Sequence, residues 1–371
     1  MARLVPLLAI LGLAVTSSAA QPISAGAGTI YVGAYSGHIL AIDEATQAVT
    51  EIPLKTGRPF AVRLSSDQSR FYVQSANLEH FEVVDIRRRQ SLDTFTLGDA
   101  RRHVRVLAYD VDPRHRMMVL VARTATRLND RFEISGAELI QYDLAEHRVV
   151  RTVPWSADPE PEFYFINLRF SPDGKFLYAF GQQILVFDAS SLEQVASWDL
   201  SLPNESGLGR FDAGSWDESA DEPGAFTSLF TMQDAVTMRK LLVVGQVNLV
   251  ARTLDFFPLG PEPTSGDLSF SIAPDRRRAY VLSSEIGHYE LWTIDMPNRR
   301  VLSRESIPGR PRMQIRSSSS GQVLYVYQAG HTIDRYAADG FRALDTISLD
   351  SDMMYGTFYI LPPSPRPVAE R

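Results

Sequence analysis

Short runs of alternating apolar and polar residues, separated by turn signals, dominate this chain. The stretch SPDGKFLYAFGQQILVFDASSLEQV (171–195) shows the pattern: a turn, an apolar run at 176–180, a second turn, a run at 184–187 that ends in Asp188, and a third run from Leu192. Alternation over about four to eight residues between turns is typical of strands rather than helices. The stretch therefore predicts antiparallel strands joined by tight turns.

The same unit recurs along the chain. Its first strand recurs at 29–33, 70–74, 117–121, 176–180, 240–244, 278–282 and 322–327. The partner strand recurs as ILAID, FEVVD, LIQYD, ILVFD and LWTID, and in weaker form around 250–254 and as TIDRY (332–336). Four-stranded units repeated every ~40–50 residues are typical of a β-propeller. The predicted fold is all-β, a seven-bladed β-propeller of four-stranded antiparallel blades.

The two ends of the repeat array are unequal. No strand precedes 29–33 in the first blade, whereas YGTFYIL (355–361) is left over after the seventh. We expect this C-terminal strand to complete the first blade as its innermost strand, which leaves no open edge in the ring. The fifth blade, at about 226–260, is the most weakly marked, and its Pro258 is unsuited to a central strand.

Five partner strands end in an aspartate: Asp43, Asp85, Asp143, Asp188 and Asp295. A short acidic side chain favours a turn because it accepts hydrogen bonds from its own backbone two residues further on. We therefore interpret these aspartates as turn residues rather than as a catalytic or metal-binding set.

Strands within a blade are labelled A to D from the inside outward. In this topology the B–C turns and D–A connections lie on one rim, and the A–B and C–D turns lie on the other. Three long insertions, 122–137, 154–163 and 202–225, are all predicted on the first rim, around blades 3 to 5. Long loops on a rigid scaffold often carry binding functions. The candidate partner-binding residues there are Arg131, Phe132, Trp155, Phe163, Arg210, Phe211, Trp216 and Phe226.

The acidic loop at 204–226 has two interpretations. Trp216 makes it a candidate contact with an aromatic anchor. Its glycines and acidic residues are equally compatible with a solvated connection.

Residues 1–20 have the features of a secretory signal peptide. Arg3 is followed by an apolar run at 4–15 and small residues at 18–20. We expect a single propeller domain over 21–371, with a disordered tail at 363–371. No later stretch is apolar enough to cross a bilayer, so we expect an exported, periplasmic protein with no membrane insertion.

Composition excludes several functions. The net charge of −7 argues against nucleic-acid binding. The absence of cysteine excludes a cysteine nucleophile, cysteine-ligated zinc, iron–sulfur clusters and covalent haem attachment. His38, His80, His288 and His331 all precede strand C, but strand C stands ~10 Å outside the innermost strand, so these side chains are not expected to converge on one metal. We predict no catalytic, cofactor-binding or metal-binding residues in this chain.

The repeat resembles the YVTN type of seven-bladed propeller. The order FEISGAELIQYDL (132–144), LRFSPDGKFLYAFGQQILVFD (168–188), an acidic Trp-bearing loop, and SFSIAPDRRRAYVLSSEIGHYELWTID (269–295) resembles the β chain of quinohemoprotein amine dehydrogenase. The heavy chain of methylamine dehydrogenase is similar in architecture.

This resemblance implies a non-redox subunit of a periplasmic amine-oxidising complex. The propeller would be a platform for a small chain that bears a tryptophan-derived quinone and for a chain that binds c-type haem. Two other hypotheses remain open. One is a stand-alone periplasmic propeller that binds a protein or small ligand through the insertion-bearing rim, and the other is an independent enzyme such as a lactonase-like propeller.

Overall fold

The computed structural model describes residues 23–157, 161, 166–181, 184–198, 208–217, 220, 222, 224–234, 236–263, 267–309 and 313–363. For 208–216 and 355–356 it describes the backbone alone. The predicted signal peptide and all but the first residue of the predicted tail lie outside these ranges. Within them every regular element is a β-strand, and the described chain contains no helix with the length and hydropathy of a membrane span.

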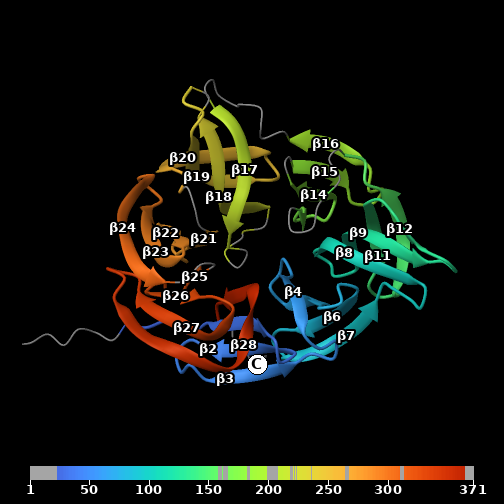
Figure 1. The fold of residues 1–371 in the computed structure, drawn as a ribbon, viewed down its shortest axis with the longest axis horizontal. Coiled ribbons are helices and arrows are strands. Elements are labelled where there is room, and N and C mark those ends of the chain that lie inside the picture. Colours follow the sequence, from blue (N-terminus) through green and yellow to red (C-terminus); the bar gives the residue numbers. More distant parts are fainter. Residues whose placement is uncertain are drawn as a thin grey trace, which may run out of the picture.

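The strands follow one another in groups around a ring (Figure 1). The first half of the chain contains β1 (Thr29–Ala34), β2 (His38–Asp43), β3 (Val49–Pro53), β4 (Pro59–Leu64), β5 (Arg70–Ser75), β6 (His80–Asp85), β7 (Gln90–Thr96), β8 (Arg102–Val111), β9 (Met117–Arg127), β10 (Phe132–Ile134), β11 (Glu138–Asp143), β12 (Arg148–Pro154), β13 (Asn167–Phe170), β14 (Phe176–Phe180), β15 (Ile184–Asp188) and β16 (Gln194–Trp198). The second half contains β17 (Leu208–Trp216), β18 (Ala225–Asp234), β19 (Lys240–Asn248), β20 (Thr253–Pro261), β21 (Asp267–Ile272), β22 (Arg278–Glu285), β23 (Gly287–Asp295), β24 (Arg300–Gly309), β25 (Gln314–Ser317), β26 (Val323–Tyr327), β27 (Gly330–Ala337) and β28 (Ala343–Leu361).

These strands confirm a propeller of antiparallel, mostly four-stranded blades. Four sheets have four strands each, β4–β7, β13–β16, β17–β20 and β21–β24, and a fifth sheet contains β8 to β12. The remaining sheet has seven strands in the order β25-β26-β27-β28-β1-β2-β3. Five blades are therefore separate sheets, rather than the predicted seven, because the strands expected for the last and first blades form one continuous sheet.

The long strand β28 joins those two groups. Its first part pairs with β27, with Ile347 opposite Ile333, and its last part pairs with β1, with Leu361 opposite Thr29. The predicted pairing of the C-terminal strand with the first repeat is thus confirmed. The two halves of this sheet nevertheless pack face to face, because Ile30 of β1 and Tyr325 of β26 belong to one buried cluster.

Apolar side chains fill the space between neighbouring sheets. Tyr72 and Phe81 of one sheet pack with Leu120 and Ile140 of the next, and the rings of Phe81 and Tyr109 meet edge to face at 5.0 Å. Both faces of an inner strand are covered by neighbouring sheets, so an inner strand such as β14 is buried along most of its length. Alternation of buried and exposed residues appears in the outermost strands, such as β24, which have one face in solvent.

Glu44 ties the first repeat to the last repeat. Its side chain is 2% exposed. It accepts hydrogen bonds from the Gly28 amide at 3.0 Å, the Ser319 amide at 3.1 Å and the Tyr325 hydroxyl at 3.0 Å. The buried carboxylate therefore satisfies donors from the N-terminal segment and from β26 and the turn before it.

The predicted aspartate turns are confirmed. In each, the carboxylate accepts hydrogen bonds from backbone amides two or three residues further on, as Asp188 does from Ser190 and Ser191 at 2.9 Å each. The same holds for Asp43, Asp85, Asp143 and Asp295.

The predicted strand assignment of the fifth blade is wrong. Residues 240–244 lie in β19, the third strand of their sheet rather than the second, because β17 and β18 precede it. The segment predicted as a D–A connection, 202–225, contains β17 at its centre. Its sequence LGRFDAGSW has few β-branched residues and gives no strand signal. Pro258 lies in β20, an edge strand of the sheet, where the missing amide donor is tolerated.

We define the B–C rim by the turns 35–37, 76–79, 128–137, 236–239, 286 and 328–329, and the A–B rim by the turns at the opposite ends of the same strands. Backbone hydrogen bonds join the turns of the B–C rim to the neighbouring D–A connections. Examples are Leu97 to Glu79 at 3.1 Å and Tyr35 to Asp352 at 2.9 Å.

The substitution Glu44→Gln tests the seam between the first and last repeats. An amide places an N–H group against backbone donors, so we expect the free energy of unfolding to fall by about 1.5–3 kcal/mol. Urea denaturation measures this loss. Glu193→Gln, at an exposed turn residue, is the matched control and should leave stability unchanged; equal effects of the two substitutions would contradict the proposed role of Glu44.

Candidate functional site

Exposed apolar side chains gather on the B–C rim. The most exposed are Phe132 (61%), Ile134 (69%), Val236 (88%), Met238 (63%) and Ile286 (89%), all in turns or short strands of this rim. A single apolar side chain of similar exposure, Val250 (71%), lies at a turn of the A–B rim. Among the described residues, this asymmetry makes the B–C rim the candidate interaction surface.

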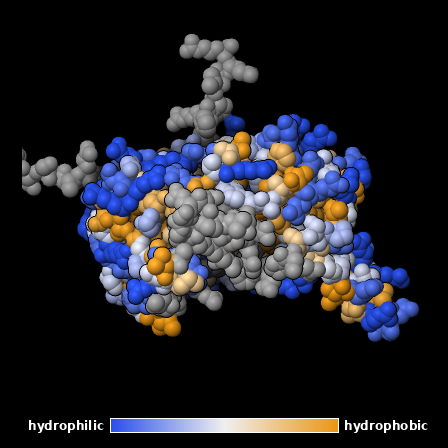
Figure 2. Space-filling model, turned by 90° about the horizontal axis from the view of Figure 1, so that it is seen from above, coloured by the Kyte–Doolittle hydropathy of each residue, from blue (hydrophilic) through white to orange (hydrophobic). Residues whose placement is uncertain are grey.

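The insertion predicted at 122–137 forms a projecting hairpin. β9 continues beyond the end of β11 and pairs there with β8 on one side and with β10 on the other. Figure 2 shows an extension at the right-hand end of the molecule, the side on which Figure 1 places β9 and β12, with hydrophobic and hydrophilic surface side by side. The hairpin extends the sheet above the rim, because β9 has eleven residues where β14 has five.

A cavity of about 370 Å³ lies against this hairpin. Its apolar lining comes from Leu97, Val104, Ile134, Ile140 and Val149, and its polar lining comes from Arg102, Thr124, Thr126, Glu133, Ser135, Glu138 and Thr152. The cavity therefore combines an apolar floor with hydroxyl groups, two carboxylates and one guanidinium.

The strand register explains which side chains meet here. Arg102 of β8 lies opposite Thr126 of β9, which lies opposite Glu133 of β10. Two residues further along β8, Val104 lies opposite Thr124 of β9. Because side chains alternate between the faces of a sheet, both rows project from the same face.

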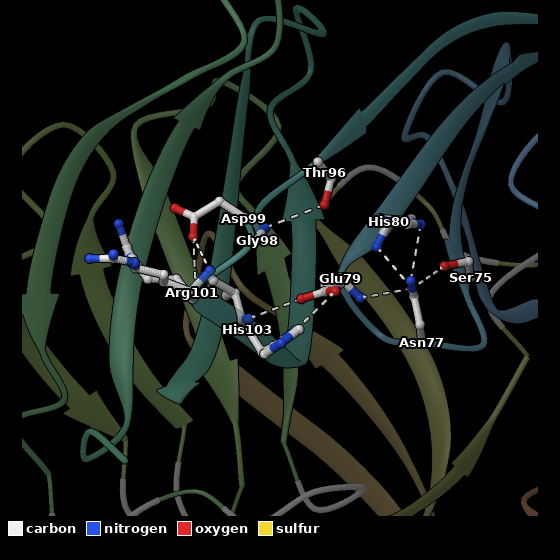
Figure 3. A network of polar contacts seen from close by, with 11 residues as sticks. Ser75, Asn77, Glu79, His80, Thr96, Gly98, Asp99, Arg101 and His103 are labelled. Atoms are coloured by element: carbon white, nitrogen blue, oxygen red, sulfur yellow. Dashed lines mark hydrogen bonds and ion pairs between the residues drawn. The ribbon is translucent and has the colours of Figure 1, made fainter. Parts of the chain in front are cut away.

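A network of polar contacts fixes the connection that leads into the cavity (Figure 3). The Glu79 carboxylate accepts a hydrogen bond from the Val104 amide at 3.3 Å and lies 3.4 Å from Nδ1 of His103. The Asp99 carboxylate accepts hydrogen bonds from the amides of Arg101 at 2.7 Å and Arg102 at 2.8 Å. The backbone of 99–104 is thereby held, which positions Arg102 and Val104 in the cavity wall.

Two polar features of the cavity lack partners among the described residues. Thr124 is 8% exposed, and its Oγ1 atom has no hydrogen-bond partner there. Glu133 and Glu138 form no ion pair with another described residue, although Arg102 lines the same cavity. The cavity therefore contains unused hydrogen-bonding capacity and an excess of negative charge.

The structure separates the predicted partner-binding residues. Phe132 is exposed on β10, and Arg131 is beside it at the hairpin tip, where its guanidinium lies 3.3 Å from Asp130. Trp155 is half-buried and packs on Phe187 at 5.6 Å. Trp155 therefore contributes to the packing between two neighbouring blades.

The other predicted residues lie elsewhere. Phe226 is buried and lines a cavity on the A–B rim. Arg210, Phe211 and Trp216 lie in β17, of which the backbone alone is described. Phe163 lies outside the described residues.

The A–B rim holds a second cavity of about 360 Å³. It is lined by A–B turns of successive sheets, including Asp67, Pro113 and Pro172, together with Asp110 and Phe226. The Asp110 carboxylate accepts a hydrogen bond from the Phe170 amide at 2.7 Å, so this charge contributes to the packing between neighbouring inner strands.

The four histidines that precede strand C have separate local neighbours. His38 lies 3.7 Å from Glu51, His288 3.7 Å from Glu285, and His331 3.7 Å from Asp352, whereas His80 contacts Asn77 at 3.0 Å. Within the described ranges, no group of three or more His, Asp or Glu residues could hold a metal ion.

Sequence reasoning missed Ile134, Val236, Met238 and Ile286. Each is a single apolar residue next to polar or turn residues, a signal that also marks strand ends. Their common position on one rim becomes visible only after each turn has been assigned to an end of its sheet.

No protein-family model matches this sequence, and no curated protein is similar to it. Solved structures match the fold. Hydrazine synthase of Kuenenia stuttgartiensis is 16% identical, with 86% of this chain and 96% of that chain covered and a TM-score of 0.49. A functionally unknown protein from Desulfotomaculum acetoxidans DSM 771 is 14% identical, with 91% of this chain and 99% of that chain covered and a TM-score of 0.53. The second similarity supports the propeller fold alone.

Asp67 links two A–B turns. Its carboxylate accepts hydrogen bonds from the Ser65 hydroxyl at 2.7 Å and the Ser69 hydroxyl at 2.8 Å, and it lies 3.0 Å from Nε2 of His115. The other ring nitrogen of His115 lies 2.8 Å from the Tyr72 hydroxyl. Partial burial favours a higher pKa for Asp67, but the hydrogen bonds from Ser65, His115 and Ser69 outweigh it and hold the pKa well below its usual value.

This shift predicts acid-sensitive stability. The folded-state pKa of Asp67 is below its unfolded value of ~3.9, so its stabilising contribution is complete above that value and is lost as the pH falls towards the folded-state pKa. We expect Asp67→Asn to lower the melting temperature at pH 7, with a difference from the wild type that shrinks steadily below about pH 4. Asp130→Asn, at an exposed carboxylate, is the control. A difference for Asp67→Asn that stayed constant from pH 7 to pH 2 would contradict this role.

Proposed function

We propose that this chain is an exported propeller that provides a non-catalytic platform, and that it binds a partner protein through the B–C rim. The observation that supports the proposal is the gathering of the most exposed apolar side chains on that rim. These side chains come from the turns of three different sheets, so a partner that contacts them together would cover a broad part of the rim, as a protein does and a small molecule does not.

The A–B rim favours a different role. Its turns are held by aspartate side chains that bond their own backbone, and large apolar side chains in its turns, such as Phe341 and Leu192, are buried, with Val250 as an exception. These features of the A–B rim stabilise the fold. The projecting hairpin and the exposed apolar groups lie at the other end of the strands.

The specific form that we propose follows the resemblance to the amine dehydrogenase propeller chains. In this form the seven-stranded sheet counts as two blades that share β28, which gives seven blades in all. The partners are a small subunit with a tryptophan-derived quinone and a subunit with c-type haem, and the location is the periplasm. In this form the cofactors belong to those partners, since a quinone made from cysteine and tryptophan and a covalently attached haem both need cysteine, which this chain lacks.

The alternative is a stand-alone exported propeller that binds another protein or a small ligand through the same rim. The cavity beside β10 favours this version, because it is a lined site within a single chain. The amine dehydrogenase form requires permanent partner subunits, whereas the stand-alone propeller does not.

Affinity purification from the source organism tests the platform. A tagged chain is cross-linked in the cells and purified, its companions are identified by mass spectrometry, and an absorption spectrum records any haem. We expect the double substitution Val236→Ser and Ile286→Ser to reduce recovery of the partner about tenfold or more, because exposed apolar anchors dominate protein interfaces.

The matched control is Val250→Ser on the A–B rim, which removes a similarly exposed apolar side chain. It should leave recovery unchanged. A haem band and a quinone-bearing companion would support the amine dehydrogenase form. A chain recovered alone under these conditions, or equal loss in both variants, would contradict a platform that acts through the B–C rim.

A further inference from the structure

β10 is a short edge strand whose free side faces away from β9. Backbone hydrogen bonds join Leu128 to Arg131 at 2.8 Å and Ser135 to Thr124 at 2.9 Å. Because hydrogen-bonded positions alternate along an antiparallel pair, the amide and carbonyl groups of Phe132 and Ile134 point outward from β9. No other described strand pairs with that edge.

The residues with these outward-facing backbone groups also have the exposed side chains. Phe132 and Ile134 are each more than half exposed on the same short strand. An edge that offers backbone donors and acceptors together with apolar side chains is the arrangement to which an extended peptide adds as a further strand.

Glu133, between them, belongs to the cavity. It lines the cavity together with Glu138, and Thr124 contributes a buried hydroxyl without a partner. Val104 and Ile140 supply apolar lining. A long basic side chain fits this combination, because its methylene stem can pack on apolar groups while its charged head reaches the carboxylates and the hydroxyl.

We propose that the hairpin binds an extended segment of a partner protein with the pattern apolar–basic–apolar. The segment pairs with the free edge of β10, and its basic side chain enters the cavity between Glu133 and Glu138. This inference rests on the proposed platform function and specifies how one part of the rim recognises its partner.

The register favours the basic residue opposite Glu133. Since the backbone of Glu133 faces β9, the residue across from it on the added strand forms a non-hydrogen-bonded pair, in which side chains approach most closely. The flanking apolar residues then lie beside Phe132 and Ile134.

A second copy of this chain is a poorer occupant. Antiparallel pairing of two β10 strands about their centres places the two Glu133 carboxylates opposite each other, and like charges in that position are destabilising. Charge complementarity therefore favours a different chain with a cation at the centre of its strand.

Synthetic peptides test this proposal on the full-length protein. The probe is labelled Thr-Val-Lys-Val-Thr, and its matched control replaces the lysine with glutamine. Fluorescence anisotropy should show that the lysine peptide binds at least about tenfold more tightly, because a charged donor makes a stronger hydrogen bond to a carboxylate than the neutral amide of glutamine does. We expect the preference to weaken at high salt.

Protein and peptide variants separate the two parts of the proposal. Glu133→Gln should abolish the preference for lysine, whereas Glu193→Gln, at an exposed turn elsewhere, should retain it. Methylation of the two valine amides of the peptide should weaken binding without any change to the protein, because it removes the donors that pair with β10.

Several results would overturn the proposal. They are equal binding of the lysine and glutamine peptides, absence of binding by either, unchanged binding in Glu133→Gln, and equal binding of the peptide and of acetyl-lysine methylamide, which lacks a strand. These outcomes are independent of partner recovery. A partner retained through Val236 and Ile286 without lysine-peptide binding would leave the platform intact and reject the recognition by β10.

Discussion

β28 closes the ring of sheets because it pairs with both β27 and β1. A ring of sheets has two open ends until one strand connects them. The first half of β28 pairs with β27 and its second half pairs with β1, which joins the last strands to the first. The buried carboxylate of Glu44 reinforces the same seam with three hydrogen bonds from donors that are far apart in the sequence. Once the ring is closed, each sheet has a neighbour on both faces and its apolar residues are covered.

Closure also determines where function can reside. The faces of the blades are used for packing, as the cluster that joins Tyr72 to Leu120 shows. Exposed surface remains on the outer strands and at the two rims. The A–B rim is occupied by tight turns in which aspartates such as Asp67 and Asp188 accept hydrogen bonds from backbone amides two residues further on. The B–C rim has the projecting hairpin and the exposed apolar residues, so it is available for recognition.

The hairpin illustrates how a small insertion becomes a site. Lengthening β9 gives β10 a partner on one side only, which leaves one edge without a neighbour among the described strands. The same extension places Thr124 and Glu133 beside Glu138 of β11, around a cavity that Arg102 and Val104 of β8 complete. Glu79 and Asp99 hold the connection to β8 in place. The free edge of β10 and the cavity beside it therefore both result from the greater length of β9.

The sequence predicts the propeller, the aspartate turns and the pairing of the C-terminal strand, because alternation and turn residues are local signals that repeat. It also located the insertion that contains Phe132. The tertiary structure was needed to show that β28 joins two blades in one sheet, and that 208–216 is a strand, since this segment contains no β-branched residue and is recognised only by its pairing with β18. The tertiary structure also brought Thr124, Glu133 and Glu138 together and placed Ile286 and Val236 on one rim. Such proximity depends on strand register and on the order of sheets around a ring, which no local pattern specifies.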